Sequence, residues 1–200
     1  RGIGRYSYAL MRTLIENSSA NDKFILVANK SLDKPDNGEV EIDGLNILDL
    51  NNYEIAKIRN QKIGFVFQFH HLLSEFTALE NVLMPAWIGN LSSQKKDEAV
   101  NLFSELNLSA KMNFYPNQLS GGERSRVALI RGIINKPKIL LADEPTGNLD
   151  EKNASVLIEL LKKINTKFNQ SIIITTHNPD VAKLGCERFN LVNGILKTMR

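Results

Sequence analysis

The stretch Ile139-Leu140-Leu141-Ala142-Asp143-Glu144-Pro145-Thr146 decides the fold and points to a site. Apolar residues followed by two acids are typical of a buried strand whose carboxyl end reaches solvent. In α/β proteins, ligands bind at that edge of the sheet. The adjacent carboxylates of Asp143 and Glu144 suit two tasks there: one can hold Mg²⁺, and the other can orient or activate a water molecule. An acidic turn that only caps the strand is the alternative, and the pair alone does not separate the two.

Strand and helix patterns alternate around this stretch. Short apolar or alternating runs predict strands at 23–28, 39–42, 63–67, 138–142 and 171–175, and an Asn193-Gly194 turn predicts a hairpin of 189–192 with 195–197. Helical spacing of apolar residues predicts helices at 5–17, 95–108, 124–134 and 153–168. This alternation indicates an α/β domain with a mainly parallel sheet.

The composition is that of an ordinary globular protein. The 200 residues are 42% apolar and 24% charged, enough to bury the core of one or two domains. A net charge of +3, with scattered Lys and Arg, argues against a nucleic-acid partner. The single Cys186 excludes an internal disulfide and fits a reducing compartment. No apolar run approaches the ~20 residues of a membrane span, and the chain begins at Arg1, so we expect a soluble protein or a piece of one.

A second signal is Leu119-Ser120-Gly121-Gly122-Glu123, directly before a helical pattern. Ser120 and Glu123 have the spacing of a capping box, which predicts that the helix begins here. The free backbone N–H groups of a helix start, with two glycines that allow close approach, form an anion site suited to phosphate. A plain helix cap is the alternative, and it is the better explanation if the motif stands alone.

Two polar residues complete the set, each directly after a predicted strand. His177 follows the strand at 171–175, where an imidazole can hydrogen-bond a terminal phosphate. Gln68 ends the strand at 63–67, where its amide can reach a metal ion or water. Either residue by itself is more often structural. They indicate a functional site only in combination with the two motifs above, because all four features occur in a specific order and spacing.

That order and spacing resemble the nucleotide-binding subunit of ABC transporters. In this resemblance Gln68 corresponds to the Q-loop, 119–123 to the signature motif, 139–143 to the Walker B strand, Glu144 to the catalytic base, 147–150 to the D-loop, and His177 to the switch histidine. It covers roughly residues 32–200. It implies a P-loop NTPase-like α/β fold in which residues from about 70 to 135 form a helical subdomain that carries the signature motif.

The resemblance implies an ATPase that uses ATP and Mg²⁺. Asp143 and Gln68 would hold the metal, Glu144 would polarise the attacking water, and His177 would contact the γ-phosphate. The remaining nucleotide-binding residues would be Ser120, Gly121, Gly122, Glu123 and Asp150. Two copies would face each other, so that the signature motif of one closes on the ATP held by the other. Integral membrane permease subunits would supply the path for the cargo.

Residues 59–73 and 76–82 narrow the resemblance to the lipoprotein-releasing, LolD-like subgroup, whose near relatives are macrolide-export and FtsE-like ATPases. The run 143–150, DEPTGNLD, fits all three, whereas 69–73, FHHLL, points to lipoprotein release. The implied location is the cytoplasmic face of a bacterial inner membrane. The segment 69–73 is apolar with two histidines, so it could bind a cytoplasmic helix of a membrane partner; alternatively, its histidines simply pack at the surface.

The sequence departs from the family pattern at the segment that should bind the phosphates of ATP. The glycine-rich loop G-x-x-x-x-G-K-[ST], whose N–H groups and lysine cradle the phosphates, is absent from the sequence. No glycine occurs between Gly4 and Gly38. Lys23 stands near the expected lysine position but lies in a strand pattern, so we interpret it as a coincidence. We therefore expect the chain as written to bind ATP poorly and to turn it over little.

Residues 1–31 resemble something else, the N-terminal βαβ unit of family-4 glycosyltransferases. The resemblance rests on Gly2-Ile3-Gly4-Arg5-Tyr6-Ser7-Tyr8 and on 21–27. We therefore predict a foreign segment at 1–31 joined to an ABC ATPase domain at 32–200, with a divergent native N-terminus as the alternative. Three functions follow: a lipoprotein-releasing ATPase, a non-catalytic ABC subunit, and, remotely, a glycosyltransferase fragment.

Overall fold

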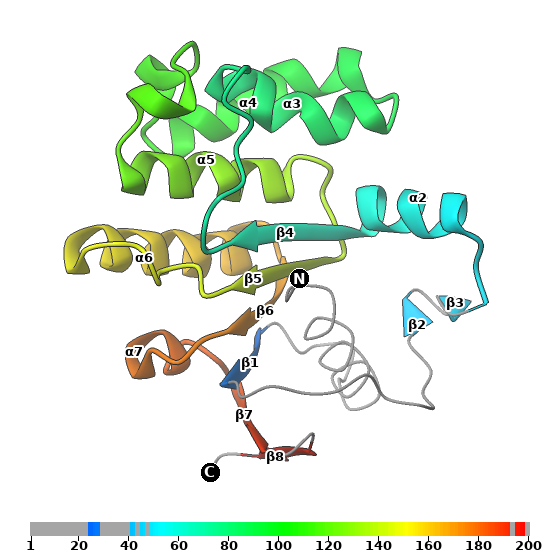
Figure 1. Cartoon of the computed structure of the whole chain (residues 1–200), viewed down its shortest axis with the longest axis vertical. Coiled ribbons are helices and arrows are strands. Elements are labelled where there is room, and N and C mark those ends of the chain that lie inside the picture. Colours follow the sequence, from blue (N-terminus) through cyan, green and yellow to red (C-terminus); the bar gives the residue numbers. More distant parts are fainter. Residues whose placement is uncertain (1–23, 29–40, 43–44, 47–48, 193–194, 199–200) are drawn as a thin grey trace.

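The computed structural model describes residues 24–28, 41–42, 45–46, 49–192 and 195–198 (Figure 1). Its strands are β1 (Phe24–Ala28), β2 (Glu41–Ile42), β3 (Leu45–Asn46), β4 (Ile63–Phe67), β5 (Ile139–Asp143), β6 (Ser171–Thr175), β7 (Glu187–Val192) and β8 (Ile195–Thr198). Its α-helices are α2 (Asn52–Lys62), α3 (Ala78–Ile88), α4 (Ser92–Glu105), α5 (Gly121–Ile133), α6 (Glu151–Lys167) and α7 (Pro179–Ala182), and 3₁₀ turns lie at Ser109–Lys111 and Pro116–Gln118.

Within the described residues, the main sheet has six strands in the order β4-β5-β6-β1-β7-β8. The first five run parallel to one another, and β8 pairs antiparallel with β7. A separate two-stranded hairpin joins β2 to β3. The predicted α/β class with a mainly parallel sheet is therefore confirmed.

The strand order places a ligand crevice at the carboxyl ends of β1 and β6. The chain leaves β1 toward β4, at one edge of the sheet, and leaves β6 toward β7, on the other side of β1. Connections that leave neighbouring strands in opposite directions open a crevice, and ligands of α/β proteins bind there. The strand β1 comes from the segment predicted to be foreign; the boundary at residue 31 stays a prediction.

Helices α3, α4 and α5 form a helical layer over β4, with α5 between the sheet and the other two helices (Figure 1). The middle of α5 is covered on every side: the consecutive residues Val127, Ala128, Leu129 and Ile130, which point all around the helix, have no exposed surface. Because α5 packs against α3, α4, α6 and β4 at once, it joins the helical layer to the sheet. The predicted helical subdomain at about 70–135 corresponds to this region, although its bounds stay a prediction.

Glycines allow α5 to lie directly on β4. A Cβ atom on Gly64 in β4 would overlap the backbone carbonyl oxygen of Gly132 in α5. A Cβ atom on Gly132 would in turn lie 3.0 Å from Leu140 Cδ1 and 3.1 Å from the carbonyl oxygen of Phe65. The backbones of helix and strand therefore touch at a point where Gly64 cannot carry a side chain and Gly132 can carry one only if its neighbours shift by a few tenths of an ångström.

The predicted strands at 63–67 and 171–175 are confirmed residue for residue, and the other predicted elements differ by a few residues at their ends. The helix predicted at 5–17 and the turn at 193–194 lie outside the described residues. Helices α2 and α3 were missed. Each begins with a capping box, at Asn51 with Glu54 and at Thr77 with Glu80, which is a signal that the sequence carries. Within the described ranges, no helix is long and apolar enough to cross a bilayer.

Replacing Gly64 by Ala should destabilise the protein by about 1–3 kcal/mol, because the methyl group forces β4 and α5 apart. Urea unfolding followed by circular dichroism measures this loss. Gly121→Ala is the matched control: its Cβ would meet only Leu149 Cδ2, at 3.9 Å. We expect the control to stay within about 0.5 kcal/mol of the parent. Equal losses in the two variants would contradict the packing argument.

Candidate functional site

The turn after β5 is fastened to the end of β6. The hydroxyl of Thr175 donates a hydrogen bond to Asp143 Oδ1 at 2.6 Å, and the backbone N–H of Glu144 donates to the carbonyl oxygen of Thr175 at 2.9 Å. Glu144 has φ 44°, a left-handed conformation that is uncommon for a non-glycine residue. Asp143 is exposed and Glu144 half-buried. The two carboxylates therefore leave a strand end whose conformation the neighbouring strand fixes.

The carboxylate of Glu144 is held by the residues that follow β6. His177 donates its backbone N–H to Glu144 Oε1 at 2.9 Å, and its ring Nδ1 lies 2.6 Å from the same oxygen. The hydroxyl of Thr176 donates to Glu144 Oε2 at 3.3 Å. The side chain of His177 is 79% exposed, against 18% for Glu144. The ring thus anchors to the carboxylate on one side and faces solvent on the other.

Gln68, at the end of β4, meets the loop that follows Glu144. The side-chain amide of Asn148 donates to the carbonyl oxygen of Gln68 at 3.1 Å, and Gln68 Nε2 lies 3.4 Å from Asn148 Oδ1. The N–H of Gly147 donates to the carbonyl oxygen of Glu144 at 2.9 Å. A Cβ atom on Gly147 would lie 2.7 Å from Gln68 Nε2. The structure therefore brings Gln68 into the group of Asp143, Glu144 and His177.

The start of α5 forms the second group of predicted site residues. Ser120 Oγ accepts the N–H of Glu123 at 3.2 Å, and Glu123 Oε2 accepts the N–H of Ser120 at 2.7 Å, so the predicted capping box is present. Glu123 also pairs with Lys111 at 3.3 Å. Burial alone raises the pKa of Glu123, but the bonds from Ser120 and the charge of Lys111 outweigh it and set the pKa below its ordinary value. Glu123 therefore acts as a helix cap in this structure.

Gly122 and Asp150 tie the starts of α5 and α6 together. A Cβ atom on Gly122 would overlap Oδ1 of Asn153, in the first turn of α6. Asn153 is itself fixed, because its backbone N–H and its side-chain amide both donate to Asp150 at 2.8 Å. These bonds hold the pKa of Asp150 below its ordinary value. Asp150 is thus the N-cap of α6, and Gly122 is needed for close packing of the two helices.

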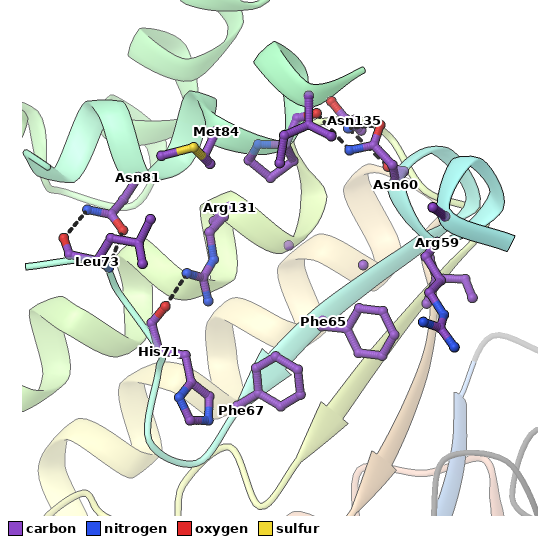
Figure 2. A pocket seen from close by; sticks show the side chains of 16 residues that line it. Arg59, Asn60, Phe65, Phe67, His71, Leu73, Asn81, Met84, Arg131 and Asn135 are labelled. Carbon is purple, nitrogen blue, oxygen red and sulfur yellow. Dashed lines mark hydrogen bonds between the residues drawn. The ribbon is translucent and has the colours of Figure 1, made fainter. Parts of the chain in front are cut away.

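A pocket of about 490 Å³ opens between β4, α2, α3 and α5. Figure 2 shows Phe65 and Phe67 of β4 on one side, Met84 of α3 above, and Arg131 of α5 reaching toward His71. Phe65 and Phe67 stack with their ring centroids 5.6 Å apart, and Phe67 meets the edge of His71 at 5.2 Å. The pocket is a mainly apolar hollow beside the turn that begins at Gln68.

The sequence profile of the ABC transporter family matches residues 25–147. The chain is 40% identical over 188 residues to the lipoprotein-releasing system ATP-binding protein LolD of Leptospira interrogans, covering 94% of this chain and 79% of the relative. It is 43% identical over 185 residues to the LolD protein of Cytophaga hutchinsonii, covering 92% of this chain and 84% of the relative. The chain belongs to the ABC transporter family of ATP-binding subunits.

Solved structures agree with this assignment. The dimeric ABC cassette MJ0796 superposes with a TM-score of 0.78 at 35% identity, covering 92% of this chain and 88% of the cassette. A second structure of that cassette, in a post-hydrolysis state with ADP and Pi, has the same TM-score at 34% identity. The predicted P-loop NTPase-like fold and LolD-like resemblance are therefore confirmed. The roles of the individual site residues stay predictions.

The donor set of this ABC chain fits Mg²⁺ in part. Asp143 and Gln68 offer a carboxylate and an amide oxygen at the ends of neighbouring strands, which suits a cation that binds one or two carboxylates together with phosphate oxygens. Among the described residues, no cluster of three His, Cys, Asp or Glu side chains could enclose a metal by itself. Residues 29–40, which follow β1 in the sequence, lie outside the described residues.

Sequence reasoning gave Thr175 no role in the site, and it named Asn148 and His70 only as members of the segments 147–150 and 69–73. Thr175 and Asn148 hold Asp143 and Gln68, and His70 is buried against Ser125 rather than lying at the surface, so that alternative for His70 is wrong. The hydroxyl at the end of a buried strand was a usable signal for Thr175. Nothing in the sequence pairs His70 with Ser125, because they lie 55 residues apart.

Gly122→Ala should destabilise the protein by about 1–3 kcal/mol, since the new methyl group meets Asn153. Removing the Asn153 side chain should restore part of the lost unfolding free energy. The double variant Gly122→Ala with Asn153→Ala should therefore be more stable than Gly122→Ala alone. A double-mutant cycle of urea unfolding measures this coupling. Additive losses would show that Gly122 and Asn153 do not meet.

Proposed function

We propose that this chain carries the hydrolytic residues of the ATP-binding subunit of an ABC transporter that releases lipoproteins from a bacterial inner membrane, and that hydrolysis requires a phosphate loop that this sequence lacks. The observation that carries the proposal is the Glu144 carboxylate, fixed at the sheet's crevice by His177 and Thr176, with Asp143 beside it. The name of the LolD relatives supports lipoproteins as the cargo. The subunit would sit at the cytoplasmic face of the membrane as a peripheral protein.

Each residue of the proposed site has one task. Glu144 accepts a hydrogen bond from the attacking water and polarises it, while His177, already bonded to Glu144, presents its exposed ring to the γ-phosphate. Asp143 and Gln68 would hold Mg²⁺, which would supply positive charge against the phosphate oxygens. The bond from Thr175 to Asp143 keeps that carboxylate in place before the nucleotide arrives.

Two copies of the chain would complete the site. The first-turn N–H groups of α5, at Gly121 and Gly122, have no partner within the helix and suit a phosphate held by a second copy. Ser120 and Glu123 shape that helix start, and Asp150 fixes the α6 turn against which it packs. The dimeric state of the MJ0796 cassette supports this arrangement.

The pocket beside α3 suits a cytoplasmic helix of an integral membrane permease. Leu73 and Ile88 line it and are 44% and 69% exposed, so apolar surface is available to a partner. Phe69, in the same turn, is 71% exposed. The hollow is of the kind that receives the apolar face of an amphipathic helix, and it adjoins Gln68. Docking there would connect the permease to the ATP site.

A non-catalytic ABC subunit is the second candidate, and a specific observation favours it. The sequence contains no G-x-x-x-x-G-K-[ST] loop, and the strand β1, which lies at the crevice, is followed by Asn29-Lys30-Ser31 instead. Without the N–H cradle of that loop, the β- and γ-phosphates lose their main ligands. The chain would then contain Asp143 and Glu144, the residues proposed to act on metal and water, but would bind ATP only weakly.

We expect the 200-residue chain to hydrolyse Mg-ATP close to background. A variant with a G-x-x-x-x-G-K-S loop inserted after Ala28 should hydrolyse it measurably, and Glu144→Gln in that variant should lower the rate by about 10²–10⁴-fold. Release of inorganic phosphate measures both. If the loop-bearing variant shows no turnover that depends on Glu144, the ATPase roles are wrong. Glu144-dependent turnover by the unmodified chain would instead eliminate the non-catalytic candidate.

Leu73→Asp and Ile88→Asp should each weaken association with the permease at least tenfold without destabilising the fold, because a charge enters the apolar hollow from exposed positions. Val156→Asp, on the exposed side of α6 and 40% exposed in the parent, is the matched control. Co-purification with co-expressed permease subunits of the lipoprotein-releasing system measures association. Equal retention by all three variants would exclude the pocket as the docking site.

A further inference from the structure

The turn after β4 has a backbone that needs outside support. Its residues His70 and His71 have φ of 61° and 46°, so two consecutive non-glycine residues are left-handed. The N–H of His70 donates to the carbonyl oxygen of Phe67 at 3.0 Å, and that of His71 to the carbonyl oxygen of Phe69 at 2.6 Å. Such conformations persist only where surrounding structure holds them, and they concentrate at functional and switch regions.

The support comes from α5. Arg131 donates from Nη2 to the carbonyl oxygen of His70 and from Nη1 to that of His71, both at 2.6 Å; Figure 2 shows the second bond. The ring of His70, only 8% exposed, places Nε2 3.2 Å from Oγ of Ser125, which is 1% exposed. We call His70, Ser125 and Arg131 the latch.

The hydrogen-bond pattern favours one tautomer of the His70 ring. Ser125 donates its hydroxyl proton to the carbonyl oxygen of Gly121 at 3.0 Å, and its oxygen is then free to accept from His70 Nε2–H, 3.2 Å away. We therefore expect the ring to carry a proton on Nε2.

The latch joins two groups of site residues that no other described hydrogen bond joins directly. On one side, Gln68 lies two residues before His70 and is bonded to Asn148, in the loop after Glu144. On the other side, the hydroxyl of Ser125 is bonded to Gly121, the first residue of α5. A displacement of the Gln68 turn therefore moves a buried, hydrogen-bonded ring that rests on the first turn of α5.

We propose that His70 is a positioning residue that couples the Gln68 turn to the first turn of α5 through Ser125. The consequence for ATP rests on the proposed function. There, Gln68 serves the nucleotide of its own copy, whereas the start of α5 serves the nucleotide of the partner copy. His70 then transmits the occupancy of one site to the other. The contact of Gly122 with Asn153 is a second route between the same regions, and the experiment must separate the two.

Hydrogen exchange of the full chain, measured by mass spectrometry, tests the coupling without nucleotide. Ser125→Ala should speed exchange roughly tenfold both in the Gln68–Leu73 turn and in the first turn of α5, because one buried hydrogen bond is lost. Ser155→Ala is the matched control, since Ser155 makes the same bond to the residue four positions before it, Glu151, but meets no ring. The control should leave both segments unchanged.

The decisive readout is a cycle with Gln68→Ala. In the parent, this change should speed exchange in the first turn of α5 by roughly 2- to 30-fold, the range of couplings between linked sites. In the Ser125→Ala background, it should add nothing there. An equal effect in both backgrounds would assign the coupling to Gly122 and Asn153 and overturn the proposal, as would no effect in the parent.

A spectroscopic signature separates positioning from mere packing. Nitrogen-15 spectra of the three histidine rings should show His70 as the Nε2–H tautomer in the parent, and Ser125→Ala should shift its Nε2 resonance. His70→Asn, which retains a side-chain N–H donor, should restore part of the coupling that His70→Ala removes. Because no arm requires ATP, a failure of the proposed ATPase leaves this test intact, and a failed cycle leaves the ATPase roles intact.

Discussion

The direct contact of α5 with β4 is the constraint on which the rest of the structure depends. Gly64 and Gly132 have no side chains, so helix and strand backbones meet, and the middle of α5, at 127–130, is buried on every side. Because packed interiors deform little, this contact fixes where both ends of α5 lie. One end carries Ser120 and the glycines of the proposed anion site, and the middle of the helix carries Ser125 and Arg131, which contact the turn after β4.

The parallel sheet determines how the residues of the proposed site are arranged. Strands β4, β5 and β6 end side by side, so Gln68, Asp143 and His177 come together although 109 residues separate the first from the last. Hydrogen bonds from Thr175 to Asp143, from Thr176 to Glu144 and from Asn148 to the backbone of Gln68 then hold this edge in place before any ligand arrives. Preorganised polar groups at a fixed edge are what phosphoryl transfer demands of a protein, since its chemistry needs positioning and charge stabilisation more than covalent steps.

Several residues of the predicted site have a structural task that is visible in the fold. Glu123 and Asp150 are helix caps, and Gly122 allows α5 to approach Asn153. These tasks are compatible with nucleotide binding, because an anion site at a helix start requires that the helix start be fixed. The strand β1 also has a structural task. It pairs with β6 and β7 in the sheet, although no glycine-rich loop follows it in the sequence. Sheet pairing and phosphate binding are thus separate properties of that segment.

The sequence by itself determined the α/β class, most strands and the catalytic candidates, because buried strands such as 171–175 and capping signals such as Ser120 with Glu123 are local patterns. It also determined the absence of a phosphate loop, which is a fact of composition and order. Only the tertiary structure decided that His70 faces Ser125, that Gly122 meets Asn153, and that Thr175 holds Asp143. Each of these contacts joins residues on different elements, and their distance depends on how helices and strands pack, which no local pattern encodes.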